Sequence, residues 1–352
     1  MMSRAEWRLA LQMGATYIGT VVGAGFASGQ EVLQFFTRFG TPALFGIAVT
    51  TALFILLGGF IMSLGRWPGN GTFGAVAASL LGQTLSRAVN ILLIFMLIGV
   101  TIAMVAGSGA LLQEQTGLPF LAGAALSVVI AGVTVLAGLR AIMIANSLIV
   151  PSLLLFVALT FIMAGGQHAA PVLSHSAAGL PVWLHALAAA ITYAGFNVGL
   201  SLTVLVPLGR VPVRKRTLWS GAAFGALGLG FMLLLMHLLL TANASALAVQ
   251  VPIGRIAQSL PPFLRIGFML VLWGEIYSTL LANVYGIARE LQSIFRLPFP
   301  AAAAFVLLLA LGACRIGFAR IVSIGYPLFG YGGLVILGLL IGRAGELRLK
   351  QL

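Results

Sequence analysis

The sequence has 352 residues, of which 61% are hydrophobic and 7% are charged, and its mean hydropathy is +1.12. Soluble domains are about one-quarter charged, so this composition excludes an ordinary soluble protein and predicts an integral membrane protein in a lipid bilayer. The formal net charge of +13 does not predict nucleic-acid binding, because the basic residues cluster in the short gaps between apolar runs.

Ten apolar segments are long enough to cross about 30 Å of hydrocarbon, and they predict an all-α protein with ten transmembrane helices. In chain order they cover residues 7–36, 42–64, 88–112, 119–139, 141–165, 181–208, 218–240, 262–288, 299–314 and 321–341. With the N-terminus inside, fourteen basic residues fall on its side of the membrane and five on the other. This asymmetry predicts cytoplasmic N- and C-termini, and we expect a multi-pass protein of the bacterial cytoplasmic (inner) membrane.

The first apolar segment is interrupted by the glycine-rich and polar stretch GAGFASGQE at residues 23–31. Glycine is a poor helix former, and non-helical backbone at membrane depth survives only where it lines a cavity or is buried by protein. Ser28 and Glu31 match the S-x-x-E capping box that begins a helix. We therefore expect two half-helices, with carbonyl groups suited to a cation ending the first and N–H groups suited to an anion starting the second.

An internal repeat is indicated by the motif AGFASG at residues 24–29, which recurs as AGFNVG at residues 194–199, an offset of 170 residues. Because each half would hold five helices, an odd number, the second copy would be inverted. The sequence thus predicts a single membrane domain over residues 1–352, with one repeat over about 7–165 and the other over about 181–342. Helices 1 and 6 would both be broken at a binding site. The alternative is that these glycines only allow helices to pack closely.

Two acidic residues, Glu31 and Glu275, lie inside predicted spans, where a charged group is costly and a functional role is the default hypothesis. Glu31 serves either as a helix cap or as a coupling residue. Glu275 shares one helix face with Ser278 and Thr279, its i+3 and i+4 neighbours. The alternative for Glu275 is a neutral carboxyl that is hydrogen-bonded to a neighbouring helix.

Asn197 lies within the second copy of the motif, and its amide can both donate and accept hydrogen bonds. We expect it to contact the solute. Its alternative role is to satisfy backbone groups that a broken helix 6 would release.

Three longer motifs carry a resemblance to a known family. They are TYIGTVVGAGFASGQEVLQFFTRFG at residues 16–40, VLVPLGR at residues 204–210 and GEIYSTLLANVYG at residues 274–286. In these motifs and in its span order, the chain resembles the amino acid permeases of the YkvI type, within the amino acid–polyamine–organocation superfamily. The resemblance implies the leucine-transporter fold, with helices 1 and 6 unwound, and secondary transport.

The resemblance also implies where ligands bind. The carbonyls of Gly19 and Val22 would face a cation, and the hydroxyls of Ser278 and Thr279 would complete a sodium site. The residues implied or predicted for the solute are Ala24, Gly25 and Phe26, whose amides would face its carboxylate, together with Tyr193, Phe196, Asn197 and Ser108. Residues 141–165 contain no lysine, unlike the proton-driven relatives that have a lysine on helix 5.

These observations predict a secondary active transporter of a small amino acid or related solute, working by alternating access and coupled to a cation, with sodium favoured over the proton. We expect no other cofactor or metal. A channel or a substrate sensor on the same fold is an alternative. A membrane-embedded enzyme is a weaker one, because the sequence has no H-E-x-x-H, G-x-S-x-G or nucleotide-binding loop motif.

Overall fold

The computed structural model describes residues 2–67, 73–136, 152–153, 155–163 and 181–349, and within these ranges it contains helices and no strand. Seven helical segments of this part are long and apolar enough to cross a membrane. They are α4 (Pro42–Leu64), α5 (Phe73–Thr116), α8 (Val182–Leu208), α9 (Lys215–Thr241), α11 (Pro262–Phe295), α12 (Phe299–Ala313) continued by η4 (Cys314–Ile316), and α13 (Phe318–Arg320) continued by η5 (Ile321–Gly325) and α14 (Tyr326–Leu349). Helix α6 (Phe120–Leu136) is apolar but shorter. The predicted fifth span lies largely outside the described residues, so the count of ten stays a prediction.

The first span is broken, as predicted, into α1 (Arg4–Val21), α2 (Ala24–Ala27) and α3 (Gln30–Phe35). Val22 and Gly23 separate α1 from α2 in extended conformations, with ψ of 117° at Val22 and φ of −136° at Gly23. A short helix, η1 (Thr37–Phe39), follows α3. The break therefore comes at the start of the glycine-rich stretch rather than throughout it.

The predicted capping box at Ser28 and Glu31 is wrong. Gly29 precedes α3 with φ of +82°, a left-handed conformation that favours glycine. Gly29 has no side chain to cap α3, and the Ser28 hydroxyl accepts a hydrogen bond from the Gln30 N–H at 3.3 Å. The Ser28 hydroxyl also donates to the Gly25 carbonyl at 3.0 Å, because the chain turns again between α2 and α3.

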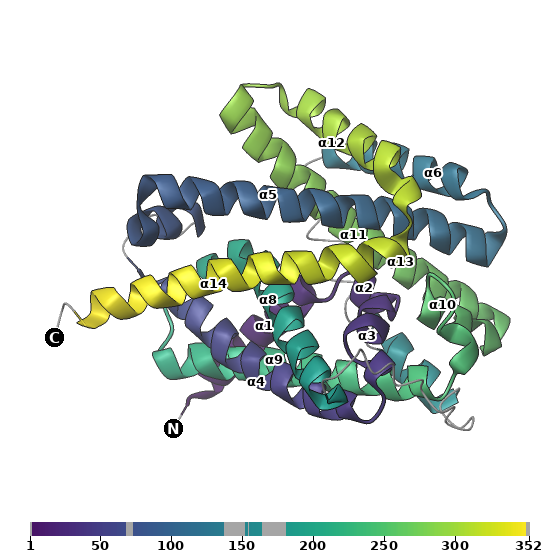
Figure 1. Cartoon of the computed structure of the whole chain (residues 1–352), viewed down its shortest axis with the longest axis horizontal. Coiled ribbons are helices and arrows are strands. Elements are labelled where there is room, and N and C mark those ends of the chain that lie inside the picture. The colour runs from purple at the N-terminus through teal and green to yellow at the C-terminus, as the bar shows by residue number, and fades with distance from the viewer. Residues whose placement is uncertain (1, 68–72, 137–151, 154, 164–180, 350–352) are drawn as a thin grey trace.

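The helices form two groups, which Figure 1 shows one above the other with α14 crossing in front. In one group, α1 packs on α9, and α4 packs on α8 and α9. In the other group, α5 packs on α6 and α11, and α12 packs on α5, α6 and α11. If α1 is exchanged with α8 and α4 with α9, the same pairs of helices remain in contact, as an inverted repeat requires. The repeat itself stays a prediction.

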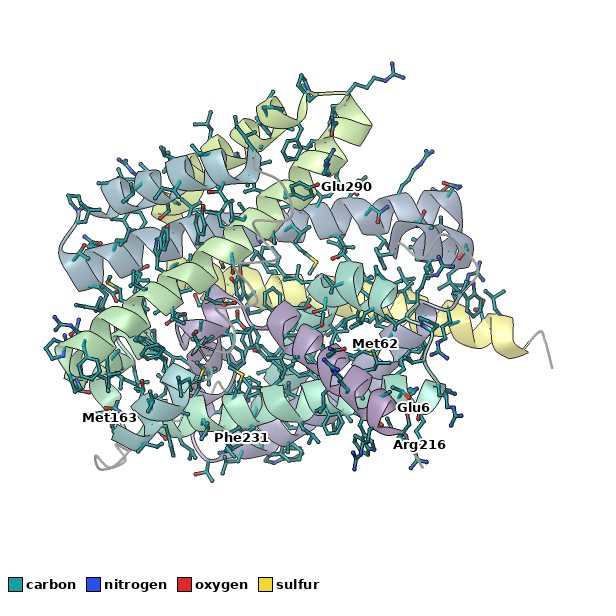
Figure 2. The ribbon with its side chains drawn as sticks, turned by 180° about the vertical axis from the view of Figure 1, so that it is seen from behind. Glu6, Met62, Met163, Arg216, Phe231 and Glu290 are labelled. Atoms are coloured by element: carbon teal, nitrogen blue, oxygen red, sulfur yellow. The ribbon has the colours of Figure 1, made fainter. Side chains whose placement is uncertain are left out.

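The outer surface carries large apolar side chains, as a lipid-facing surface does. Phe231 on α9 is 61% exposed and points away from the bundle (Figure 2). Charged groups gather at the end of the molecule where α1 begins. Glu6 in the first turn of α1 pairs with Arg214 at 3.4 Å. Figure 2 shows Glu6 and Arg216 at this end and the apolar Met163 at the other end. This distribution suits a chain that spans a bilayer.

The predicted break in the sixth span is wrong, because α8 runs without interruption through residues 194–199. Gly195 and Gly199 instead allow α8 and α14 to approach each other. An added Cβ at Gly333 of α14 would lie 2.0 Å from the Gly195 carbonyl oxygen, and one at Gly199 would lie 2.9 Å from the Gly333 Cα. Close packing, the alternative explanation, therefore accounts for the glycines of this motif.

We expect Gly333→Ala to destabilise the protein by about 1–3 kcal/mol, because the new methyl group meets backbone rather than a movable side chain. Gly338→Ala, on the same helix, is the matched control, since a Cβ there meets nothing within 4 Å. Thermal unfolding of the purified variants measures the difference. Equal unfolding temperatures for the two would contradict the packing described above.

Candidate functional site

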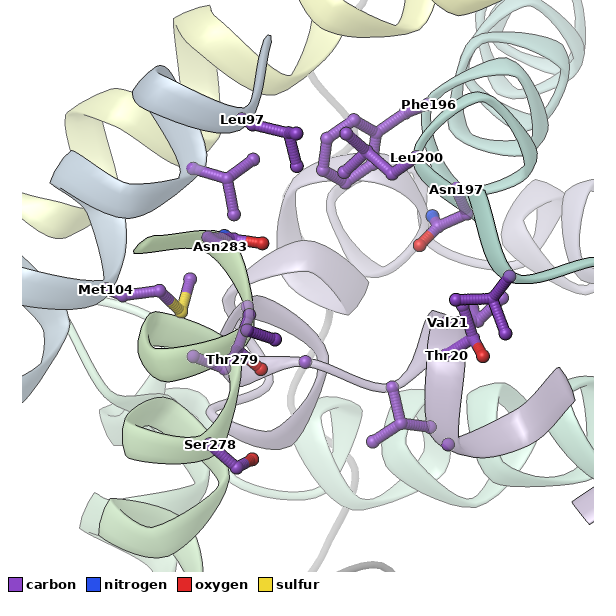
Figure 3. Close-up of a pocket in the computed structure, with 18 of the residues that line it drawn as sticks. Thr20, Val21, Leu97, Met104, Phe196, Asn197, Leu200, Ser278, Thr279 and Asn283 are labelled. Atoms are coloured by element: carbon purple, nitrogen blue, oxygen red, sulfur yellow. The ribbon is translucent and has the colours of Figure 1, made fainter. Parts of the chain in front are cut away.

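A cavity of about 380 Å³ lies at the break between α1 and α2, where the two helix groups meet. Its wall is built from five parts of the chain. They contribute Gly19, Val22, Ala24, Gly25 and Glu31 from the first span, Leu97, Val100 and Met104 from α5, Phe196, Asn197 and Leu200 from α8, Glu275, Ser278, Thr279 and Asn283 from α11, and Tyr326 from α14. Figure 3 shows the side chains of Asn197 and Asn283 pointing into the cavity from opposite sides, with Met104 on the α5 wall.

Most of the predicted site residues meet in this cavity, and three do not line it. Phe26 is fully buried in α2, outside the cavity lining. Tyr193 is buried between the rings of Phe35 and Phe36, each with its centroid 5.1 Å from that of Tyr193. The Ser108 hydroxyl donates to the Val105 carbonyl at 2.9 Å within α5. For these three residues the structure gives a packing role, and direct contact with a solute stays a prediction.

Oxygen atoms gather at the end of α1. The last helical hydrogen bond there runs from Val22 N–H to the Ile18 carbonyl, so the carbonyls from Gly19 onward have no donor within the helix. The Thr279 hydroxyl oxygen would be 3.6 Å from a Cβ at Gly23, which places α11 beside the break. These hard oxygen donors fit a small cation such as sodium.

Two buried carboxyl groups line the cavity. Glu31 and Glu275 are 3% and 2% exposed, and the Oε2 atom of each has no hydrogen-bond partner among the described residues. Buried polar atoms are paired in the great majority of cases, so such exceptions call for an explanation. A ligand or a proton that is held in the cavity would supply one.

Glu31 reaches back to the start of α2 instead of capping its own helix. Its carboxyl lies over Gly25, where an added Cβ would be 2.1 Å from Oε1, and beside the Phe26 N–H and the Tyr193 side chain. Neither Oε2 nor the Tyr193 hydroxyl makes a hydrogen bond of normal geometry among the described residues. The chain's own carboxyl thus covers the N–H groups on which the resemblance places a substrate carboxylate.

Asn283 and Tyr326 are among the lining residues that were not predicted. Asn283 comes four residues after Thr279 and so follows the same face of α11, a signal that the sequence contains. Its Nδ2 atom is buried without a partner among the described residues. Tyr326 reaches the cavity from α14 and packs against Phe196, with ring centroids 4.4 Å apart and ring planes tilted by 31°. Only the tertiary packing reveals Tyr326.

The exposed lining residues of the cavity all lie on the C-terminal parts of α8 and α11. They are Thr203 and Val204 near the C-terminal end of α8, and Ala282 and Glu290 in the C-terminal half of α11.

A connection that joins α9 to α11 lies beside the broken first span. It comprises η2 (Ala244–Ala246), α10 (Pro252–Ile256) and η3 (Ala257–Ser259). Ile253 N–H donates to the Ser28 carbonyl at 2.9 Å, and the Gln115 side chain donates to the Gly254 carbonyl at 3.0 Å. α10 is thus fastened both to the broken first span and to α5.

Two solved structures share the arrangement of these helices. The inward-facing conformation of Mhp1 matches 94% of this chain and 75% of its own chain, with a TM-score of 0.69 and 16% sequence identity. MhsT in complex with L-phenylalanine matches 97% of this chain and 89% of its own, with a TM-score of 0.58 and 18% identity. Both have the leucine-transporter fold, so the chain has this fold.

Sequence relatives identify the family. No protein-family model matches the chain. The uncharacterized protein YyaD of Bacillus subtilis (strain 168) is 26% identical over 338 residues, which cover 94% of this chain and 96% of YyaD. The uncharacterized membrane protein YkvI of the same organism is 30% identical over 339 residues, which cover 94% of this chain and 95% of YkvI. The chain therefore belongs to the YkvI family of membrane proteins.

Proposed function

We propose that the protein is a secondary active transporter of a small amino acid or a related amine-bearing solute. The observation that carries the proposal is the cavity at the α1–α2 break, which is lined by buried polar atoms of Glu31, Glu275 and Asn283 that have no hydrogen-bond partner in the described part of the chain. A broken membrane helix at the junction of two helix groups is the feature that transporters use to bind solutes at membrane depth. The likeness to the two transporter structures supports the same function.

Alternating access accounts for a cavity whose exposed lining residues all lie on the C-terminal parts of α8 and α11. In the predicted topology of a bacterial cytoplasmic membrane protein, the C-terminal ends of α8 and α11 face the cytoplasm. The exposed residues Thr203 and Glu290 then mark a cytoplasmic opening, and α10 would cover the outer side. Transport would require the reverse arrangement as well, in which α10 releases Ser28 and the C-terminal halves of α8 and α11 close.

We propose sodium rather than the proton as the coupling ion. The carbonyls of Gly19 and Val22 and the hydroxyls of Ser278 and Thr279 would supply most of its oxygen shell. Ser278 donates its hydroxyl proton to the Glu275 carbonyl at 3.1 Å, which leaves the lone pairs of the Ser278 oxygen available to a cation. A proton carrier would need only a carboxyl group and would have no use for this pair of hydroxyls.

Counterflow in proteoliposomes tests the function. Vesicles that contain the purified protein are loaded with one unlabelled amino acid or amine and receive a trace of the same labelled solute outside. We expect saturable accumulation of label with at least one solute. Entry that never saturates and shows no counterflow would indicate a channel. Binding without any flux would indicate a sensor, and either result would refute the proposal.

A further inference from the structure

The polar wall of the cavity carries acidic side chains. Glu31, Glu275 and Glu290 line it, and no lysine, arginine or histidine does so among the residues that the structure describes. Glu31 and Glu275 are almost fully buried, each with an Oε2 atom that lacks a hydrogen-bond partner in this part of the chain. Because an isolated carboxylate is costly to bury, a bound cation would stabilise this wall and a bound anion would be repelled.

The place where an anion would otherwise bind is already covered. The first turn of a helix attracts a carboxylate through its free N–H groups. In this chain, the Glu31 carboxyl lies over Gly25 and beside the Phe26 N–H. A solute that brought its own carboxylate to this turn would have to displace Glu31 and would meet a like charge. The N–H groups of α2 therefore do not serve as the anchor of an anionic solute.

The remaining wall suits the uncharged part of an organic cation. Leu97, Val100 and Met104 form an apolar patch on α5. Phe196 and Tyr326 add two aromatic rings that are in contact and tilted by 31° to each other, and the faces of aromatic rings attract positive charge. The cavity thus combines buried carboxyls with apolar and aromatic walls.

We propose that the cavity takes an organic cation through its ammonium group, which pairs with Glu31 and Glu275, and that the solute needs no carboxylate. This inference rests on the proposed function, because it names the class of solute for the same cavity. Amines and amino acids both carry the required group. Solutes that carry only a carboxylate are excluded.

Three solutes that share the side chain of leucine test the inference. The first, 3-methylbutylamine, carries only the ammonium group. L-Leucine carries both charged groups, and 4-methylpentanoate carries only the carboxylate. A second set consists of 2-phenylethylamine, L-phenylalanine and 3-phenylpropanoate. Binding to the full-length purified protein is measured by calorimetry. We expect at least one amine to bind, with an affinity equal to or above that of its amino acid, and neither carboxylate to bind. Binding of a carboxylate, or of neither amine, would overturn the inference.

Substitutions then locate the ammonium group. Glu31→Gln and Glu275→Gln should each weaken amine binding by about tenfold or more, because each removes one negative partner. Glu346→Gln is the control, since Glu346 is exposed and pairs with Arg343 at 2.6 Å, away from the cavity. If one of the two variants fails to fold, the other decides the question. Unchanged amine affinity in a folded variant would overturn the assignment of that carboxyl.

The outcomes separate this inference from the proposed function. Counterflow of 4-methylpentanoate would leave transport standing and would refute the ammonium assignment. Amine binding that depends on Glu31 and Glu275, without counterflow of any solute, would support the ammonium assignment and refute transport.

Discussion

Gly25→Val is expected to abolish solute uptake while the protein still inserts into the membrane. A Cβ at Gly25 would lie 2.1 Å from Oε1 of Glu31 and 2.8 Å from its Cγ and Cδ. The larger and β-branched valine would drive the Glu31 carboxyl from the start of α2 and fill part of the cavity. Because α2 has only four residues, the disturbance should stay at the site and spare the long helices that carry the fold.

The measurement is initial uptake, normalised to the amount of protein in the membrane. Gly312→Val is the control, because Gly312 lies on α12, where an added Cβ meets nothing within 4 Å. It should transport as the unsubstituted protein does. Normal uptake by Gly25→Val would mean that the space above Gly25 plays no part in transport.

Joint replacement of Ser278 and Thr279 by alanine is expected to remove the sodium dependence of solute binding. The coupling free energy between two ligands is typically about 1–3 kcal/mol, so sodium should raise the solute affinity of the unsubstituted protein about 5–150-fold. In the double variant, the solute affinity should be the same with and without sodium. The reason is the loss of two of the oxygen ligands that face the end of α1. Solute affinity, measured with sodium and with choline, gives the ratio directly.

Glu275→Gln separates sodium coupling from proton coupling. If sodium is the coupling ion, this variant should bind the solute more weakly but keep a sodium-dependent gain in affinity. Thr241→Ala, at the C-terminal end of α9 and outside the cavity lining, serves as a neutral hydroxyl control. Uptake that is driven by a pH gradient, indifferent to sodium and lost in Glu275→Gln would assign the coupling to the proton and to Glu275.

The two glycine motifs show how far the sequence alone predicts the fold. Both place glycines within an apolar span, and in α1–α2 they do mark a break. In α8 they mark a contact with α14, because Gly195 meets Gly330 and Gly333. Local sequence does not distinguish these roles, since the second depends on a helix that is distant in the chain.

The same limit applies to the site. The face of α11 that carries Glu275, Ser278 and Thr279 follows from helical periodicity, and these residues do line the cavity. The spacing of Ser28 and Glu31 is that of a capping box, but the left-handed turn at Gly29 directs the Glu31 carboxyl to α2. Tyr326 enters the site through long-range packing, which no local pattern encodes.

The position of the break gives the first span a hinge. The hydrogen bond from Val22 N–H to the Ile18 carbonyl closes α1, and the bond from Ala27 N–H to the Gly23 carbonyl opens α2. The four backbone dihedral angles between them, φ and ψ of Val22 and of Gly23, are constrained by neither of these hydrogen bonds. Rotation about these bonds would tilt α2 and α3 against α1 without breaking a helical hydrogen bond. The outer half of the span can therefore swing with α10 while α1 stays packed on α9.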